Sequence, residues 1–231
     1  MRIGLLLVAT GKYDIFLQPL IDSVDKFFFR NDPITIYLFT DKVEIKLIHS
    51  VRINIVIIPT EHKPFPYATL YRYKYFSGAS NLIDTDYVFY SDVDMRFVAE
   101  VGREILGDIV CVQHPGFYKG GWGSEGCSPD SLAYLDPIYR KEYKAGGFQG
   151  GETKTYIRAC GILCERINDD ESRGVMAEWH DETHWNWYLK IMCNDNQVIV
   201  LSPSYCYPES WSIPFKKKLL ALDKNHVEIR K

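Results

Sequence analysis

Short apolar runs alternate with segments of helical spacing through the first 95 residues of the chain. Four apolar runs predict buried strands, at residues 3–8, 34–39, 53–58 and 87–91. Residues 17–28 place apolar side chains on one helix face with Pro19 in the first turn, and residues 68–82 predict a second helix. This alternation, with nearly continuous apolar strands, predicts an α/β fold whose mostly parallel sheet is covered on both faces.

The second half of the chain is less regular. Apolar runs predict strands at 109–112 and 198–201, and helical spacing predicts helices over 153–169 and from Asp181 onward. Residues 144–151, "KAGGFQGG", carry four glycines and read as a glycine loop, but they lack the spacing of a P-loop or a dinucleotide fingerprint. No linker divides the chain, so a single domain spanning 1–231 is expected.

Composition narrows the class of protein. The net charge of −3 argues against a general nucleic-acid binder, and six cysteines occur without zinc-site spacing. The apolar run at the N-terminus is too short to cross a bilayer, so we expect a reduced, cytoplasmic protein with no membrane anchor. Residues 212–231 hold six Lys or Arg against two acidic residues, either as a solvated end or as an attraction for an anionic ligand.

The strand at 87–91 is followed directly by Asp92-Val93-Asp94. If the chain stays extended there, residues two apart point to the same side, and the two carboxylates converge on one point. They then repel each other unless a cation lies between them. Carboxylate oxygens suit Mg²⁺ or Mn²⁺, which complete their shell with water and substrate phosphates. The alternative is an ordinary solvated turn.

Six segments together resemble one known family. They are "VATGKYD" (8–14), "DVD" (92–94), "HPGFY" (114–118), "AGGFQGG" (145–151), "WHDETHWNWYL" (179–189) and "LSPSYCY" (201–207). In this order they resemble glycosyltransferase family 6, the retaining group that contains the histo-blood-group A and B transferases and the α1,3-galactosyltransferase. The whole chain corresponds to the family's catalytic domain, as in its short microbial or viral-type members.

The resemblance implies a fold and a division of labour. The fold is the nucleotide-diphospho-sugar transferase (GT-A-like) fold, a mostly parallel central sheet with flanking helices and a smaller acceptor-side sheet. Residues 1–95 correspond to the nucleotide-binding half, and residues 96–231 to the acceptor-binding half with the C-terminal tail. The family's "TYERR" stretch is replaced here by "SEGCSPDSLAY" (124–134), so contacts made from that stretch are not carried over.

The same resemblance implies roles for individual residues. Glu182 matches the glutamate that faces the β side of the donor's anomeric carbon. The donor-binding residues implied are Val8, Ala9, Thr10, Tyr13, Arg72, Asp92, Val93, Ala145, Gly146, Gly147, Lys224 and Arg230. The acceptor-binding residues implied are His114, Phe117, Trp179, His180 and Asp181. Asp92 and Asp94 are the implied metal ligands, and because many microbial relatives carry Asn-x-Asn and work without metal, the aspartates here favour Mn²⁺ or Mg²⁺ as cofactor.

The expected activity follows from these roles. We expect a retaining α-1,3-glycosyltransferase that moves N-acetylgalactosamine, or galactose, from a UDP-sugar to a galactose-ended oligosaccharide acceptor. Gly147 leaves room for an N-acetyl group, and the "HPGF" loop makes a fucosylated acceptor the first choice. Two alternatives stay open. A sugar nucleotidyltransferase would usually carry a glycine-rich, basic N-terminal loop, and a non-catalytic sugar-binding protein would have less reason to retain Asp92, Asp94 and Glu182.

Overall fold

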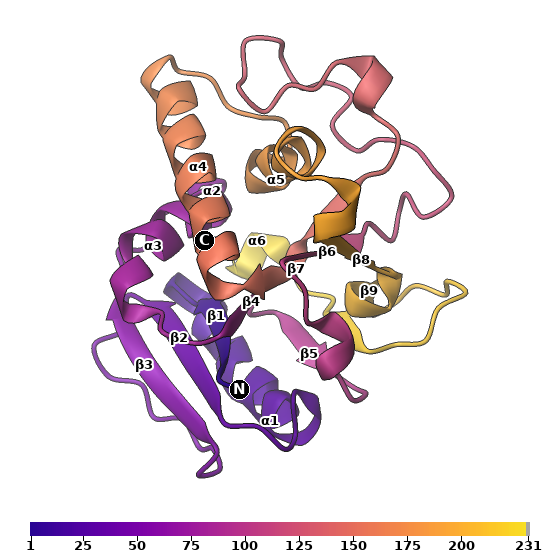
Figure 1. Ribbon diagram of the computed structural model, residues 1–231. Coiled ribbons are helices and arrows are strands. Elements are labelled where there is room, and N and C mark those ends of the chain that lie inside the picture. Colours follow the sequence, from indigo (N-terminus) through magenta and orange to yellow (C-terminus); the bar gives the residue numbers. More distant parts are fainter. Residues whose placement is uncertain (230–231) are drawn as a thin grey trace.

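A seven-stranded sheet forms the centre of the molecule (Figure 1). The computed structural model describes residues 1–229, and the strand order in this sheet is β3-β2-β1-β4-β7-β6-β8. The strands are β1 (Ile3–Val8), β2 (Ile34–Thr40), β3 (Ile53–Pro59), β4 (Tyr87–Ser91), β6 (Ile109–Gln113), β7 (Lys144–Glu152) and β8 (Val198–Leu201). All neighbours pair in parallel except β7, which is antiparallel to β4 and β6. The predicted mostly parallel sheet is confirmed.

Helices and a small second sheet cover the two faces of this sheet. The helices are α1 (Leu17–Phe27), α2 (Tyr67–Leu70), α3 (Arg72–Gly78), α4 (Thr153–Ser172), α5 (His180–Ile191) and α6 (His226–Ile229). The small sheet has the order β5-β10-β9, formed by β5 (Met95–Phe97), β10 (Leu219–Ala221) and β9 (Tyr207–Pro208). It confirms the smaller sheet implied by the resemblance.

Alternation along β1 divides the core into two layers. Leu5 and Leu7 point toward α1 and the small sheet, in one buried cluster with Phe97. Leu6 points to the opposite face, in a second cluster with Tyr73 of α3 and Trp185 of α5. Since side chains of a strand alternate between faces, an all-apolar strand such as β1 can fill both layers at once.

The prediction of a glycine loop at residues 144–151 is wrong, because these residues form β7. Every residue of this strand is buried except Glu152, which is partly exposed. Glycine is needed here because the neighbouring backbones come very close. A Cβ atom at Gly150 would overlap the Val88 carbonyl oxygen and lie 2.7 Å from the Cα atom of Phe89. The glycines therefore mark close packing of strands and not a turn.

The single helix predicted over residues 68–82 is also wrong in part. The chain forms α2, then α3 beyond Tyr71, and then a short 3₁₀ turn at Ser80–Leu82. Breaking the helix at Tyr71 begins α3 at Arg72, whose side chain is buried. The other predicted elements agree with the structure within a few residues at their ends.

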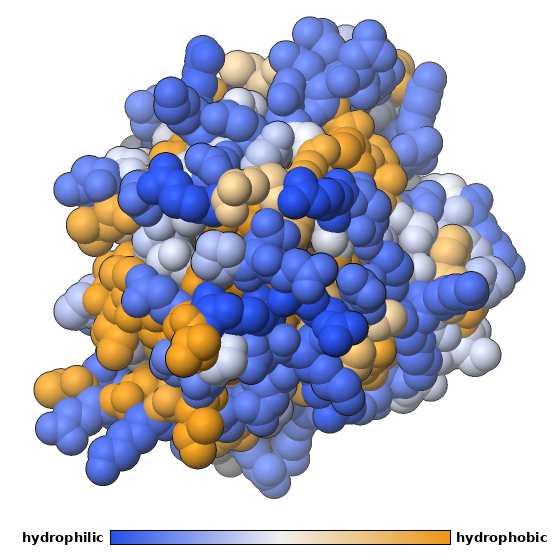
Figure 2. Space-filling view, turned by 60° about the horizontal axis from the view of Figure 1, so that its bottom comes forward, coloured by the Kyte–Doolittle hydropathy of each residue, from blue (hydrophilic) through white to orange (hydrophobic). Residues whose placement is uncertain are grey.

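The surface and the cysteines add little to the fold. Figure 2 shows one face on which hydrophilic side chains predominate and apolar ones form separate groups. All six cysteines are free, and Cys160 is buried in the core, as the helical spacing predicts. Within residues 1–229, no helix combines the length and apolar character needed to cross a membrane.

Replacing Gly150 by alanine should destabilise the protein, because the added methyl group has no space between β4 and β7. We expect the free energy of unfolding to fall by about 2 kcal/mol or more, measured by urea denaturation followed by circular dichroism. Gly161→Ala is the matched control. Its Cβ would lie 3.8 Å from the nearest side-chain atom, Ser77 Oγ, and alanine should stabilise α4 by up to about 1 kcal/mol. Equal stability of the two variants would contradict the close approach of β4 and β7.

Candidate active site

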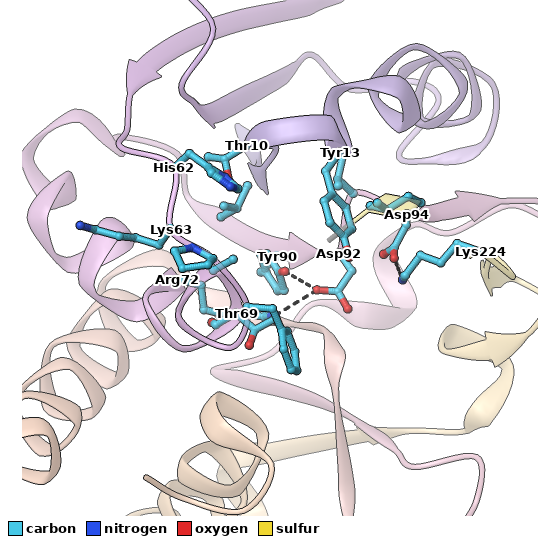
Figure 3. Close-up of a pocket in the computed structure, with 16 residues that line it drawn as sticks. Thr10, Tyr13, His62, Lys63, Thr69, Arg72, Tyr90, Asp92, Asp94 and Lys224 are labelled. Atoms are coloured by element: carbon cyan, nitrogen blue, oxygen red, sulfur yellow. Dashed lines mark hydrogen bonds and ion pairs between the residues drawn. The ribbon is translucent and has the colours of Figure 1, made fainter. Parts of the chain in front are cut away.

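A cavity of about 170 Å³ opens at the carboxyl ends of β1 and β4. Val8 at the end of β1 lines this cavity, with Thr10 and Tyr13 just after the strand, His62 after β3 and Arg72 of α3. It is also lined by Tyr90, Asp92, Val93 and Asp94 from the end of β4 and by Lys224 from the C-terminal segment (Figure 3). Ligands of open α/β sheets bind at this edge. The structure thus brings eight of the predicted donor-side and metal-side residues into one cavity.

Arg72 connects the cavity to the residues beside it. Its buried guanidinium lies 3.2 Å from Asp92 (Nη2 to Oδ1) and 3.3 Å from Asp181 (Nε to Oδ2). It also donates a hydrogen bond of 3.1 Å to the Gly146 carbonyl and lies over the ring of Tyr90. Burial alone would lower the pKa of Arg72, but the nearby carboxylates of Asp181 and Asp92 and the ring of Tyr90 outweigh it and keep this pKa well above its usual value.

The Asp92-Val93-Asp94 segment turns instead of staying extended. The chain leaves β4 at Ser91 and turns through Val93 and Asp94 before β5, so the predicted extended geometry is wrong. The two carboxylates line the same cavity but have different partners. Asp92 pairs with Arg72 and accepts a hydrogen bond from the Tyr90 hydroxyl, whereas Asp94 pairs with Lys224 (Figure 3).

The C-terminal segment that carries Lys224 is part of the fold. It follows β10, which pairs with both β5 and β9. Further along, the carbonyl of Glu228 in α6 accepts a hydrogen bond of 3.0 Å from Lys12 Nζ. Lys224 therefore does not belong to a solvated end. The other predicted basic residue of this tail, Arg230, lies outside the described residues.

Glu182 lies at the start of α5, partly exposed, beside the first residues of β7. Its Oε2 accepts a hydrogen bond of 2.7 Å from the backbone N–H of Gly146. Burial raises the pKa of Glu182 to about 7, the Gly146 N–H lowers it, and the neighbouring Asp181 carboxylate raises it. A Cβ at Gly146 would come within 3.3 Å of Asp181 Oδ2 and 3.4 Å of Glu182 Oε2, so glycine lets the two carboxylates approach the strand.

Asp181 has a similar surrounding. Burial raises the pKa of its carboxyl group to about 6, Arg72 lowers it, and Asp92 raises it. Glu182 and Asp181 therefore both titrate close to neutral pH, and such shifted carboxyl groups are typical of catalytic sites.

The other predicted donor and acceptor residues border this centre. Ala145 is buried at the start of β7, and Ala9 is buried with its N–H donated to the Phe39 carbonyl at 2.9 Å. A Cβ at Gly147 would lie 3.1 Å from Asp92 Oδ2. Hence Gly146 and Gly147 of β7 both lie next to carboxylates, Gly146 next to Asp181 and Glu182 and Gly147 next to Asp92.

The predicted acceptor residues include a group of aromatic rings. The rings of His114 and Phe117 pack against Tyr143, with centroids 5.7 and 5.4 Å away. Burial lowers the pKa of His114 to about 4, so the ring is neutral at pH 7. Trp179 is about half exposed and donates from its indole to the Gly123 carbonyl at 2.6 Å, while His180 packs edge-on against Phe65.

Several cavity residues escaped the sequence analysis. They are His62, Lys63, Phe65, Thr69 and Tyr90. The ring of His62 lies 3.1 Å from the Thr10 hydroxyl (Nδ1 to Oγ1) and occupies the space that a side chain at Gly11 would need. The sequence did hold a signal for the residues between 60 and 66. They directly follow the strand β3, and the carboxyl ends of parallel strands meet at the edge of the sheet where ligands bind.

The described residues contain no group of three or more His, Cys, Asp or Glu side chains that could hold a metal ion. Among the described residues, the carboxylates that line the cavity are those of Asp92 and Asp94. Ions such as Mg²⁺ are commonly bound by one or two carboxylates together with substrate phosphates.

Comparison with known proteins gives consistent matches over the chain. The sequence profile of glycosyltransferase family 6 matches residues 1–231. Histo-blood group ABO system transferase 1 of Rattus norvegicus is 32% identical over 240 residues, covering 99% of this chain and 68% of that protein. Globoside alpha-1,3-N-acetylgalactosaminyltransferase 1 of Gallus gallus is 27% identical over 243 residues, covering 100% and 69%. The O-antigen biosynthesis glycosyltransferase WbnI of Escherichia coli is 27% identical over 233 residues, covering 97% and 95%.

Proposed function

The chain belongs to glycosyltransferase family 6, and from this premise we propose that it is a retaining α-1,3-hexosyltransferase that uses a UDP-sugar and a galactose-ended oligosaccharide. The observation that carries the proposal is the position of Glu182. This carboxylate is fixed by the Gly146 N–H at the strand that also contacts Arg72, next to the cavity at the sheet edge. We assign residues 1–95 to nucleotide binding and residues 96–231 to acceptor binding.

The chemistry of the cavity supports a nucleoside diphosphate as the donor's leaving group. Tyr13 offers an aromatic ring for a uracil, and Thr10 and His62 offer polar atoms beside it. Arg72 and Lys224 supply two positive charges against the carboxylates at the same edge. Cations placed near a diphosphate stabilise the negative charge that develops as it leaves.

The residues present also fit a divalent cation. Asp92 and Asp94 line the cavity, and each already lies against a positive charge, that of Arg72 or Lys224. We propose that these two carboxylates hold Mn²⁺ or Mg²⁺ together with the donor's phosphates. A bound ion would supply Lewis-acid stabilisation of the leaving diphosphate. Lys224 pairs with Asp94 at the cavity and is also suited to contact the phosphates of a donor.

Glu182 is the proposed catalytic residue. A carboxylate on the β side of the anomeric carbon either attacks to form a covalent glycosyl-enzyme or stabilises oxocarbenium character. Both routes need the ionised form of Glu182. With a pKa of about 7, the ionised fraction of this carboxyl group at neutral pH changes strongly with small changes in its surroundings. Both give retention at the anomeric carbon, one by two displacements and the other by front-face substitution.

The function is tested by incubating the protein with UDP-N-acetylgalactosamine or UDP-galactose, Mn²⁺ and a galactose-ended acceptor. We expect a lengthened oligosaccharide, and Glu182→Gln should lower kcat by about a hundredfold or more while UDP affinity stays within twofold. Because the ionised carboxylate is required, kcat should fall as the pH drops below about 7. In a separate assay with UTP and a sugar 1-phosphate, release of pyrophosphate would instead indicate a nucleotidyltransferase. Equal losses of UDP affinity and turnover would show that Glu182 is a binding residue.

Asp94→Asn tests the metal proposal. The change is nearly isosteric and removes one negative charge, so we expect most of the Mn²⁺-stimulated activity to disappear while the melting temperature stays close to that of the unmodified protein. The measurement is the initial rate against Mn²⁺ concentration after treatment with EDTA. Full activity of this variant in EDTA would sink the assignment of Asp94 as a metal ligand.

The donor sugar is proposed from the space at Gly147. A side chain there would lie against Asp92 Oδ2 at 3.1 Å, Met95 Sδ at 3.4 Å and Cys206 Sγ at 3.5 Å. We propose that the lack of a side chain at this crowded position leaves the N-acetyl group of the donor access that any larger residue would block, so that UDP-N-acetylgalactosamine is preferred over UDP-galactose. An unfilled pocket penalises the smaller sugar only through lost contacts, about 1–3 kcal/mol.

The donor preference is measured as kcat/KM for both UDP-sugars with one acceptor. The unmodified protein should favour the N-acetyl donor by about tenfold or more. Gly147→Ala should shift the ratio toward galactose, because its methyl group narrows the space. UDP affinity serves as the control, since a displaced Asp92 would weaken both donors alike. A clear preference of the unmodified protein for UDP-galactose would refute the pocket argument.

A further inference from the structure

Three buried hydroxyl groups form a chain of hydrogen bonds that begins at Thr183 in α5 and ends at Tyr143, beside Glu182. Thr183 Oγ1 lies 2.8 Å from Ser124 Oγ, and Ser124 Oγ lies 2.8 Å from the hydroxyl of Tyr143. Each of the three residues is only about 1% exposed. Buried hydroxyl groups need partners, and each member of this chain supplies one for the next.

The direction of the hydrogen bonds follows from the two ends. At one end, the backbone N–H of Trp179 donates to Thr183 Oγ1 at 3.0 Å. At the other, the Tyr143 hydroxyl adjoins the carboxylate of Glu182, which as an anion can only accept. Each oxygen therefore accepts from the residue before it and donates to the next, from Thr183 through Ser124 to Tyr143. The Tyr143 proton is left to point at Glu182.

The ring of Tyr143 is fixed by its neighbours. His114, Phe117 and Trp122 surround it with centroid distances of 5.7, 5.4 and 5.0 Å. On the remaining side the backbone of Gly123 comes so close that a Cβ there would lie within 2.8 Å of ring atoms. A ring held on all sides places its hydroxyl at one point.

We propose that Tyr143 is a positioning residue that, oriented by Ser124 and Thr183, holds the Glu182 carboxylate together with the Gly146 N–H. This inference rests on the proposed catalytic role of Glu182. Two donors from neighbouring positions, Gly146 in β7 and Tyr143 just before this strand, fix both the place and the direction of the carboxylate. A fixed carboxylate is better aligned with an anomeric carbon than a freely rotating one.

The surrounding charges explain why such a hold is needed. Asp181 on the same helix, Asp92 beyond β4 and burial all raise the pKa of Glu182 and favour its neutral form. The donors from Gly146 and Tyr143 act in the opposite direction and lower this pKa.

Tyr143→Phe removes the hydroxyl and keeps the ring. We expect kcat to fall about tenfold to a hundredfold for transfer and for hydrolysis of the UDP-sugar alike, with both KM values within twofold. The carboxyl pKa of Glu182, followed by carbon-13 NMR, should rise because one donor to the ionised form is lost. Tyr156→Phe is the matched control, since within residues 1–229 no oxygen or nitrogen atom lies at hydrogen-bonding distance from its buried hydroxyl, and it should leave kcat and the Glu182 pKa unchanged.

Ser124→Ala and the double variant Tyr143→Phe/Ser124→Ala test the hydroxyl chain itself. The serine variant should lower kcat about threefold or more and raise the Glu182 pKa, since the tyrosine loses its orientation. The double variant should be no worse than Tyr143→Phe alone, because Ser124 acts through the tyrosine. An added loss in the double variant would overturn this order of action.

The remaining outcomes separate the two proposals. A raised acceptor KM with unchanged kcat and an unchanged Glu182 pKa would make Tyr143 an acceptor contact and overturn the inference. An unmodified protein that consumes no UDP-sugar would overturn the proposed function. The NMR titration would still decide the inference in that case, because it needs no turnover. Melting temperatures near that of the unmodified protein show that the variants are folded.

Discussion

The buried guanidinium of Arg72 is the contact on which the rest of the site depends. It lies between Asp92 and Asp181 and also donates a hydrogen bond to the Gly146 carbonyl. It therefore joins the end of β4, the start of α5 and the first residues of β7. Without it, the buried carboxylate of Asp181 would lose its positive partner, a loss of about 3–5 kcal/mol for a broken buried pair. The same contact fixes the residue Gly146, whose N–H holds Glu182.

Charge is distributed unevenly around Glu182. Positive groups, Arg72 and Lys224, stand on the cavity side, where a diphosphate would need them. The proposed acceptor side is neutral and aromatic, since burial keeps His114 uncharged and packs it on Tyr143. Under the proposed function, a carboxylate between these two surfaces would face a leaving anion on one side and hydroxyl groups of a sugar on the other. That arrangement suits transfer of a glycosyl group between a charged donor and a neutral acceptor.

Local sequence was sufficient for most of the fold. The apolar runs of β1 and β4 identify strands because side chains of buried strands must be apolar on both faces. β7 could not be found this way, because its glycines are required by a neighbouring backbone and carry no local strand signal. The break between α2 and α3 was missed for a related reason, since helical spacing alone does not reveal where Arg72 must be buried.

The residue types of the site were readable from the sequence, because Asp92, Asp94 and Glu182 lie in motifs that resemble one family, whose profile matches residues 1–231. Their partners were not. The pairing of Asp94 with Lys224, and the hydroxyl chain from Ser124 to Glu182, join residues far apart along the chain. Sequence by itself determined which chemical groups are present and which strands carry them. Only the tertiary structure decided which groups meet, because hydrogen bonds and ion pairs act over a few ångströms in space and folding alone sets those distances.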